Sequence, residues 1–216
     1  MGKKEYVILY RQELKNRILE VAMPLFRQYG IRSVKMDDIA KSLAISKRTL
    51  YEIYANKEEL LYEGVKEHSR KKEEELQRMM EEGSCSVMDV LLYFFKQQMR
   101  DLTEVTPQFF ADLNRFPRII AYIQEQYERH NGQSLAFFER GVEEGYFRKD
   151  VDYELISIFA NGSIQSIMQS ELNKRYDLWY IFRHVILLFM RGFCTEKGLA
   201  MIENLLEENN DKSNTF

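Results

Sequence analysis

The sequence predicts an all-α protein, and three features of the chain support that fold class. Apolar residues recur at three- and four-residue intervals along much of the chain, which places them on one face of a helix. Only 3 prolines and 10 glycines interrupt the 216 residues. Segments in which Val, Ile and Thr alternate with polar residues, as in half-buried strands, are few. We therefore expect helices throughout, in a chain long enough to bury a large core.

The first strong helix is expected near Glu13–Tyr29. It stops before Gly30, a common C-terminal signal, and it contains Pro24, a residue that kinks helices. Its buried face is predicted to consist of Leu14, Ile18, Ala22, Leu25 and Phe26.

Two short amphipathic helices are expected next, joined by a tight turn. The first is predicted to bury Met36, Ile39, Ala40 and Leu43. Ser46 is the expected N-cap of the second helix, which is anchored by Leu50 with Ile53 or Tyr54. Its outward face then carries Lys47, Arg48, Thr49 and Tyr51. These side chains supply positive charge for phosphates and hydrogen-bond donors for base edges, so the pair predicts a helix-turn-helix.

A longer segment around this pair carries landmarks at fixed spacing. They are Arg17-Ile18-Leu19, Ala22, Leu25-Phe26, Gly30, Ile39-Ala40, Ser46-Lys47, Thr49-Leu50-Tyr51, Tyr54, Lys57-Glu58 and Leu60. In order and spacing they resemble the DNA-binding domain of TetR family transcriptional regulators. The resemblance implies a helix-turn-helix domain over residues 1–57, a helical effector-binding and dimerisation domain over 58–210, and a disordered tail over 211–216. It also implies a regulator, most often a repressor, that binds a palindromic operator as a homodimer and is released by a small-molecule inducer.

The resemblance also indicates which side chains contact DNA. They are Lys35, Ser46, Lys47, Arg48, Thr49, Tyr51 and Lys57. Three departures from the family pattern fall on this surface. Lys35 replaces a capping threonine, and a lysine side chain cannot cap a helix. Ala44 replaces a turn glycine, and a positive φ there would cost about 1–2 kcal/mol. Glu52 repels phosphates unless Arg48 or Lys57 neutralises it.

Charge is divided unevenly along the chain. Residues 1–57 hold 12 Lys or Arg and 6 Asp or Glu, a net charge of +6, whereas the remainder holds 19 and 28, a net charge of −9. A basic segment on a chain whose total charge is −3 is expected where that segment meets phosphates. The alternative is that Lys3, Lys4, Arg11 and Lys15 only solvate the terminus.

Six further helices are predicted. They are Lys57–Met80, a helix from Gly83-Ser84 to about Thr103, Gln108–Arg115, Arg118–Glu144, Asp152–Leu172 and Asp177–Phe193. Asn56 and Glu59 predict a capping box at the start of the first, and Asn131-Gly132 is expected to divide or bend the longest. The middle of the helix Lys57–Met80, at Glu67–Glu75, is nearly all charged. It is predicted to be a solvated connecting rod, a lever that transmits movement to the DNA-binding domain, or both.

The last two helices predict an interface and, with the aromatic content, a cavity. Asp177–Phe193 is apolar on more than one face, so it is expected to be buried on more than one side. The predicted four-helix dimer interface comprises Ile156, Ser163, Ile167, Phe182, Ile186 and Phe189, and a purely internal helix is the alternative. The predicted cavity for a small apolar or amphipathic effector is lined by Phe94, Gln98, Phe110, Phe138, Phe159, Gln165 and Met168.

Other classes of protein are not favoured. The chain has no apolar run of about 18 residues and no signal peptide, so we expect a soluble, cytoplasmic protein. Cys85 and Cys194 lack metal-site spacing and are expected to be free thiols. His68, His130 and His184 are far apart and no catalytic motif occurs, so no enzyme, metal or cofactor is predicted. The alternatives are an all-helical enzyme with a fortuitous helix-turn-helix-like segment and a helical protein-interaction module.

Overall fold

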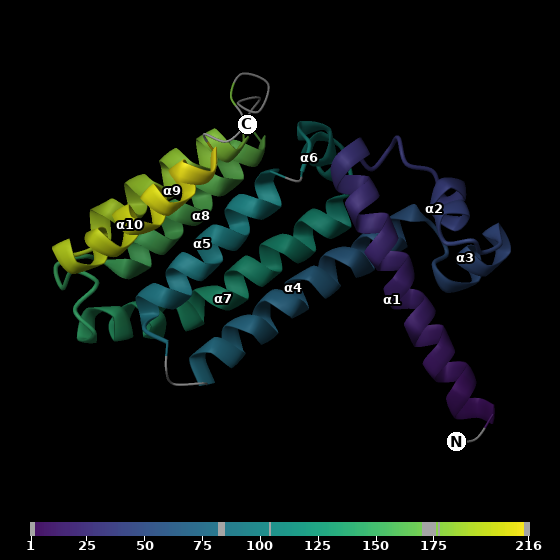
Figure 1. The fold of residues 1–216 in the computed structure, drawn as a ribbon, viewed down its shortest axis with the longest axis horizontal. Coiled ribbons are helices and arrows are strands. Elements are labelled where there is room, and N and C mark those ends of the chain that lie inside the picture. The colour runs from purple at the N-terminus through teal and green to yellow at the C-terminus, as the bar shows by residue number, and fades with distance from the viewer. Residues whose placement is uncertain (1–2, 82–84, 104, 170–175, 177, 214–216) are drawn as a thin grey trace. The chain divides into compact units, whose positions relative to one another are not determined.

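The computed structural model describes residues 3–81, 85–103, 105–169, 176 and 178–213, and within these ranges the chain forms ten helices (Figure 1). In order they are α1 (Lys3–Tyr29), α2 (Met36–Ser42), α3 (Lys47–Ile53), α4 (Lys57–Glu81), α5 (Val87–Thr103), α6 (Pro107–Leu113), α7 (Pro117–Glu143), α8 (Tyr153–Gln169), α9 (Leu178–Phe193) and α10 (Glu196–Ser213). An isolated antiparallel bridge joins Phe147 and Cys194. The prediction of an all-α fold is confirmed.

The start of α1 differs from the prediction. The helix begins at Lys3 rather than near Glu13. Its first turns carry apolar side chains that are exposed, including Tyr6 at 62 % and Ile8 at 69 %. Apolar periodicity reports only the part of a helix that packs on a core, so it could not reveal these turns.

Two differences occur farther along the chain. α7 continues unbroken through Asn131-Gly132, since a glycine inside a helix costs only about 1 kcal/mol. α10 was not predicted, because it is mostly polar and is held by few apolar residues, of which Ile202 is fully buried. α10 ends at Ser213, within the segment 211–216 predicted as a tail. The boundary predicted at Gly83-Ser84 lies outside the described residues.

The chain divides into two compact units. Unit 1 comprises residues 1–73 and 104–122, and unit 2 comprises residues 74–103 and 123–216. The long helices α4 and α7 each begin in unit 1 and end in unit 2. α6 belongs to unit 1 although it follows α5 of unit 2 along the chain. The functional boundary predicted after residue 57 stays a prediction.

Unit 1 is built around α1, with α2 and α3 on one side of that helix (Figure 1). Four of the five predicted core residues of α1 are buried, namely Leu14, Ile18, Ala22 and Phe26, and Leu25 is half-buried. α1 ends at Tyr29, directly before Gly30, whose φ of +82° is readily adopted only by glycine. The predicted stop signal is therefore confirmed.

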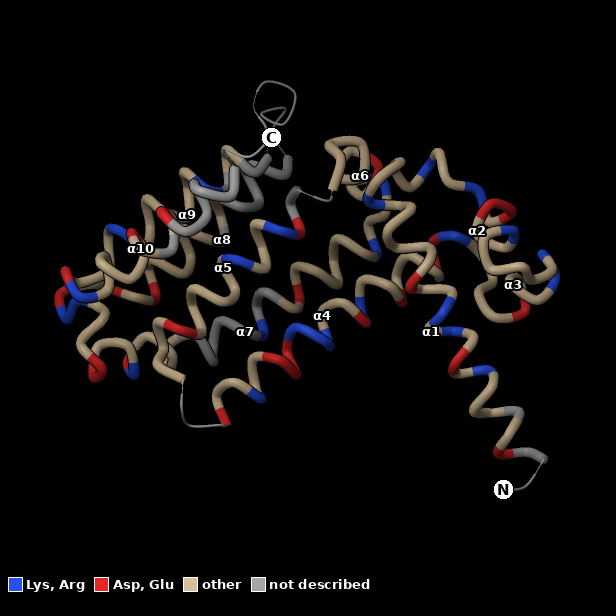
Figure 2. Tube along the Cα trace, viewed as in Figure 1, with Lys and Arg blue, Asp and Glu red and all other residues tan. Residues whose placement is uncertain are grey.

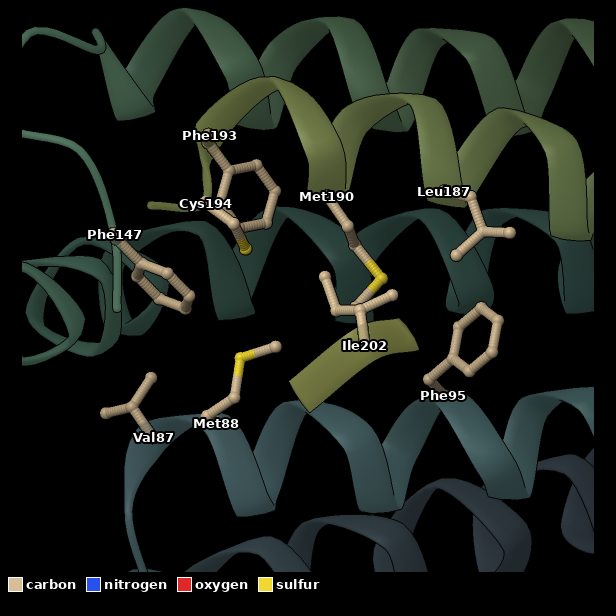
Figure 3. Packing of buried hydrophobic residues seen from close by; sticks show 9 residues of the cluster. All are labelled: Val87, Met88, Phe95, Phe147, Leu187, Met190, Phe193, Cys194 and Ile202. Carbon is tan, nitrogen blue, oxygen red and sulfur yellow. The ribbon is translucent and has the colours of Figure 1, made fainter. Parts of the chain in front are cut away.

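Unit 2 has its own core between α5, α9 and α10 (Figure 3). Its buried members are Val87, Met88, Phe95, Phe147, Leu187, Met190, Phe193, Cys194 and Ile202, and their side chains point toward one another. Gly141 of α7 makes room for the Phe147 ring, because a Cβ at that position would lie 2.0 Å from Cδ2 of Phe147. The last turn of α7 and the segment that follows it are therefore locked to this core.

Both cysteines are free thiols, as predicted. Burial raises the pKa of Cys194 to about 12, so this thiol stays protonated near neutral pH. Among the described residues, no group of three or more His, Cys, Asp or Glu side chains could hold a metal ion. Within the same ranges, no helix has both the length and the apolarity of a membrane span.

Candidate nucleic-acid interface

The helix α2 is fixed to unit 1 by Met36, Ile39 and Ala40, which are buried as predicted. The side chain of the N-cap residue Lys35 makes no capping hydrogen bond. Instead, the carboxylate of Asp38 accepts a hydrogen bond from the Lys35 N–H at 3.1 Å. The expectation that lysine cannot cap here is confirmed, and an acidic side chain in the first turn takes over that role.

The turn after α2 requires a left-handed residue. Ala44 has a φ of +54°, and it is the only residue other than glycine with a positive φ among those described. The Ala44 N–H donates to the Lys41 carbonyl and the Ile45 N–H donates to the Ala40 carbonyl, both at 3.0 Å. This pair of hydrogen bonds forms a Schellman motif, in which the left-handed position is usually occupied by glycine. The predicted strain at Ala44 is therefore present.

The helix α3 is capped and anchored as predicted. The Ser46 hydroxyl oxygen accepts a hydrogen bond from the Thr49 N–H at 3.0 Å, and the two hydroxyl oxygens lie 2.8 Å apart. Leu50 is fully buried, and Tyr54 is 3 % exposed. Burial also raises the pKa of the Tyr54 phenol. These anchors fix which face of α3 points away from the core.

The outward face of α3 carries the predicted donors. Lys47 and Arg48 are exposed, Tyr51 is 48 % exposed and Thr49 is half-buried. Basic positions also occur along α1 and on the α2–α3 pair (Figure 2). Ammonium, guanidinium, hydroxyl and phenol groups on one short helix can contact both phosphates and base edges.

Carboxylates of the same surface pair with the two cations. Lys47 forms an ion pair with Asp37 of α2, and Arg48 Nε lies 2.9 Å from Glu52 Oε1 one helical turn away. The hydrogen bond to Glu52, and then its charge, raise the pKa of Arg48. Of the two cations considered as partners of Glu52, Arg48 is the one that forms the ion pair. Exposed pairs of this kind are weak, so DNA phosphates can replace the carboxylates.

The far end of α3 is tied to α1. The Arg11 guanidinium donates from Nη2 to the main-chain carbonyl of Glu52 at 2.9 Å. A cation at the C-terminus of a helix interacts favourably with the helix dipole. Arg11 therefore has a structural partner on the candidate interface and does more than solvate the terminus.

Lys57 has a different environment from the other predicted contacts. Its Nζ donates to the Ile31 carbonyl at 2.8 Å and to the Arg32 carbonyl at 3.2 Å. Burial lowers the pKa of Lys57. Two of its three N–H donors are thus engaged within unit 1, and one is left for a phosphate.

The residues predicted to line a cavity come from four helices. Phe94 and Gln98 are half-buried one turn apart on α5. Phe138 stacks on Tyr153 with ring centroids 4.6 Å apart and packs against the unit 2 core. Phe110 belongs to α6 of unit 1.

The remaining cavity predictions fall on α8. Phe159 is 64 % exposed. The side chains of Gln165 and Met168 lie outside the described residues. The cavity therefore stays a prediction, with Phe94 and Gln98 as the pair that the structure brings together.

Three of the predicted dimer residues lie on the inner side of α8 and α9. Ile156, Ile186 and Phe189 pack against the unit 2 core, and Ser163 donates a hydrogen bond from its hydroxyl to the Phe159 carbonyl. The side chains of Ile167 and Phe182 lie outside the described residues.

Other large apolar side chains are exposed on the same two helices. Leu155, Ile158 and Phe159 of α8 are 50 %, 54 % and 64 % exposed, and Leu188 of α9 is 72 % exposed. Sequence reasoning chose Ile156 instead of its neighbour Leu155. One residue along a helix turns the side chain by about 100°, so the two neighbours face different surroundings. We call this exposed set the α8–α9 face.

Sequence reasoning also missed the contacts that span long stretches of chain. The bond from Arg11 to Glu52 joins residues 41 positions apart, and one from the Arg32 N–H to the Asp112 carboxylate joins residues 80 apart. Periodicity within one helix carries no signal for such pairs.

Comparisons with known proteins bear on this interface. Residues 18–63 match the family model described as bacterial regulatory proteins, tetR family. The HTH-type transcriptional repressor KstR2 of Mycobacterium tuberculosis is 24 % identical over 159 residues, which cover 67 % of this chain and 74 % of the repressor. The negative transcriptional regulator IcaR of the Staphylococcus epidermidis biofilm operon is 40 % identical over 52 residues, 24 % of this chain and 28 % of that protein.

A solved structure shares the fold. A protein from Saccharomonospora viridis, described as a transcriptional regulator and solved in complex with choline, aligns with a TM-score of 0.64 at 21 % identity. The alignment covers 86 % of this chain and 100 % of that one. At this level of identity the similarity concerns the fold alone.

A helix-turn-helix with buried anchors and a cationic outer helix defines the chain as a DNA-binding protein of the regulator class. The family match covers both helices of that motif. Residues 18–63 therefore form a DNA-binding segment similar to that of bacterial regulatory proteins of the tetR family. Its relatives are regulators and not enzymes, which agrees with the expectation from the sequence.

Proposed function

We propose that this protein is a homodimeric repressor that binds a palindromic operator in the cytoplasm and is released by a small-molecule inducer. The outward face of α3, with Lys47, Arg48 and Tyr51 above the buried anchor Leu50, is the observation that carries the proposal. The full set of proposed DNA contacts is Lys35, Ser46, Lys47, Arg48, Thr49, Tyr51 and Lys57. The names of KstR2 and IcaR as a repressor and a negative regulator support repression rather than activation.

The proposed homodimer is supported by the α8–α9 face. Two recognition helices must lie about 34–36 Å apart to enter successive major grooves, so one chain with one such helix is not enough. Leu155, Ile158, Phe159 and Leu188 form an exposed apolar surface on adjacent helices. A second copy covers such a surface in a four-helix interface.

The proposed inducer is a small apolar or amphipathic molecule. Half-buried Phe94 and Gln98 on α5 offer an aromatic surface and an orienting amide. Choline in the Saccharomonospora viridis structure is an example of a small molecule held by a protein of this fold. For release from DNA, the inducer must bind more tightly to the dimer form that does not fit the operator, with α4 as the proposed lever.

The test is salt-dependent binding to a duplex selected from a random-sequence pool. For the wild-type protein, the logarithm of the binding constant should fall linearly as the logarithm of the salt concentration rises. Replacing Lys47 and Tyr51 together by alanine should weaken binding at least about tenfold, because each contact contributes about 1–3 kcal/mol. Helicity and the mass of the dimer should not change.

The matched control replaces Lys149 and Tyr176, an exposed lysine and tyrosine of unit 2, by alanine. This double variant has the same change in charge and should bind as the wild type does. Equal binding by the Lys47 and Tyr51 variant and the wild type would refute the assignment of α3.

A further inference from the structure

Asp112 of α6 is a buried carboxylate in unit 1. It is 1 % exposed and is the one buried polar or charged residue among those described. One oxygen accepts a hydrogen bond from the Arg32 N–H at 2.8 Å, and the other accepts one from the Gln108 side-chain amide at 2.9 Å. Burying a carboxylate is costly unless it is hydrogen-bonded, so the cost is offset at the turn between α1 and α2.

The same turn is held from another side by Lys57. Its Nζ donates to the carbonyls of Ile31 and Arg32 at 2.8 and 3.2 Å. Both main-chain polar groups of Arg32 are therefore bound by charged side chains, the N–H by α6 and the C=O by α4. Charge-assisted bonds of this kind are about twice as strong as neutral ones.

α6 also packs closely on the end of α1. The Thr106 N–H and the Thr106 hydroxyl each donate to the Arg27 carbonyl at 3.0 Å. A Cβ at Gly30 would lie 2.7 Å from Cγ of Gln108 and 3.1 Å from Oδ2 of Asp112. The start of α6 thus holds the last turn of α1, and the end of α6 holds the turn that follows.

We propose that Asp112 is a positioning residue for DNA binding, which together with Lys57 fixes the main chain at Arg32 and so the direction in which α2 and α3 leave α1. The inference rests on the proposed DNA binding by α3. Asp112 lies outside the segment that matches the family model and outside the proposed contacts. Only the residues between Arg32 and Met36 separate the clamped turn from α2. A small rotation at Arg32 therefore moves every DNA contact on α3.

Asp112→Asn tests the proposal through the sign of its effect. The variant removes a negative charge, so long-range electrostatics alone would strengthen binding to DNA. Asparagine has one acceptor oxygen where aspartate has two, so it cannot accept hydrogen bonds from both the Arg32 N–H and the Gln108 amide as Asp112 does. The contact that fixes the main chain at Arg32 is therefore weakened. We expect about tenfold weaker binding to the selected duplex, in line with the loss of one charged hydrogen bond. The slope of the salt dependence should be unchanged, because no phosphate contact is lost.

Two controls separate positioning from other effects. Glu20→Gln, an exposed position of α1, makes the same change in charge and should not weaken binding. Met88→Ala removes a fully buried side chain of unit 2 and lowers the melting temperature without touching the turn. Binding is measured at a temperature where all variants are folded. Wild-type or tighter binding by Asp112→Asn, or equal weakening by Met88→Ala, would overturn the proposal.

Lys57→Met is the second variant, should Asp112→Asn not fold. Lys57 is also a proposed phosphate contact, so Lys57→Met should make the salt slope smaller by about 0.9 in either case. Extrapolation of the binding constant to about 1 M salt removes most of that phosphate contribution. At that salt concentration, several-fold weaker binding than the wild type supports the positioning role, and wild-type binding overturns the place of Lys57 in the clamp. Absence of salt-dependent binding by the wild-type protein would instead count against the proposed function, so the two failures are distinguishable.

Discussion

Single residues on α3 balance the attraction of the helix for DNA. Lys47 and Arg48 supply positive charge, but Asp37 and Glu52 hold them in ion pairs. A phosphate that binds these cations competes with a carboxylate for their charge. Non-specific binding depends almost wholly on phosphates, whereas an operator adds base contacts. We therefore expect the two carboxylates to favour the proposed operator over other DNA.

Glu52→Gln should strengthen binding to duplexes of unrelated sequence by several-fold at low salt. The substitution frees Arg48 and removes a charge that repels phosphates, so the salt slope should become steeper by up to about one unit. Fluorescence anisotropy with a random-sequence duplex measures both quantities.

The control for that variant is Glu125→Gln, which breaks another exposed Arg–Glu pair one helical turn apart, with Arg129 on α7. It should leave DNA binding unchanged. If both variants strengthen binding equally, net charge rather than the Arg48 pair is responsible.

Ala44→Gly should stabilise the protein by about 1 kcal/mol. Alanine at a φ of +54° is strained, and glycine adopts this conformation without penalty. The midpoint of urea unfolding, at unchanged slope, measures the gain. Ala40→Gly, in the helical part of α2, should lower stability by about the same amount or more. A loss of stability in Ala44→Gly would contradict the assigned turn.

At the scale of elements, the close approach of α7 to the segment after it depends on a residue without a side chain. Gly141→Ala places a methyl group where the Phe147 ring lies. Overpacking of a core costs about 1–3 kcal/mol, so thermal unfolding should occur at a lower temperature. Adding Phe147→Leu makes space, and the double variant should be more stable than the sum of the two single effects predicts. Additive effects would show that the ring and the glycine do not interact.

The elements also show what periodicity can predict. α2, α3, α5 and α9 each pack apolar residues on a core, so the spacing of those residues predicted the helices where they are observed. The first turns of α1 were missed because their apolar side chains, such as Tyr6, are exposed and do not pack on a core. The whole of α10 was missed because this helix is mostly polar. Gly132 was predicted to divide or bend a helix, but α7 continues through it because a long helix tolerates one unfavourable residue.

At the scale of the whole molecule, the α8–α9 face should decide the oligomeric state. Leu188→Glu places a charge in the proposed interface, where it would be buried without a partner. Light scattering should change from a dimer to a monomer of 25.9 kDa, and tight binding to the selected duplex should be lost. Ala200→Glu, at an exposed position of α10, adds the same charge and should remain dimeric. A monomeric wild-type protein would refute the interface.

The side chains of the candidate DNA interface could be predicted from the sequence, but the distant contacts that hold its helices in position could not. The local spacing around Ser46, Leu50 and Tyr54 was enough to orient α3. Asp112 could not be found, because a lone acidic residue in α6 has no pattern that links it to Arg32, 80 positions earlier. The exposed face of α8 was missed because neighbours such as Leu155 and Ile156 are equally apolar in sequence and differ only in packing.

Unit 1 is assembled from two separate stretches of chain, residues 1–73 and 104–122. A fragment that ends shortly after the helix-turn-helix therefore lacks Asp112 and the rest of α6. Transfer of unit 1 to the ligand-binding domain of another protein therefore requires two inserted segments rather than one. A single recombination crossover cannot transfer it intact. Chimeras that join at residue 63 should be soluble only where the recipient supplies an equivalent of α6.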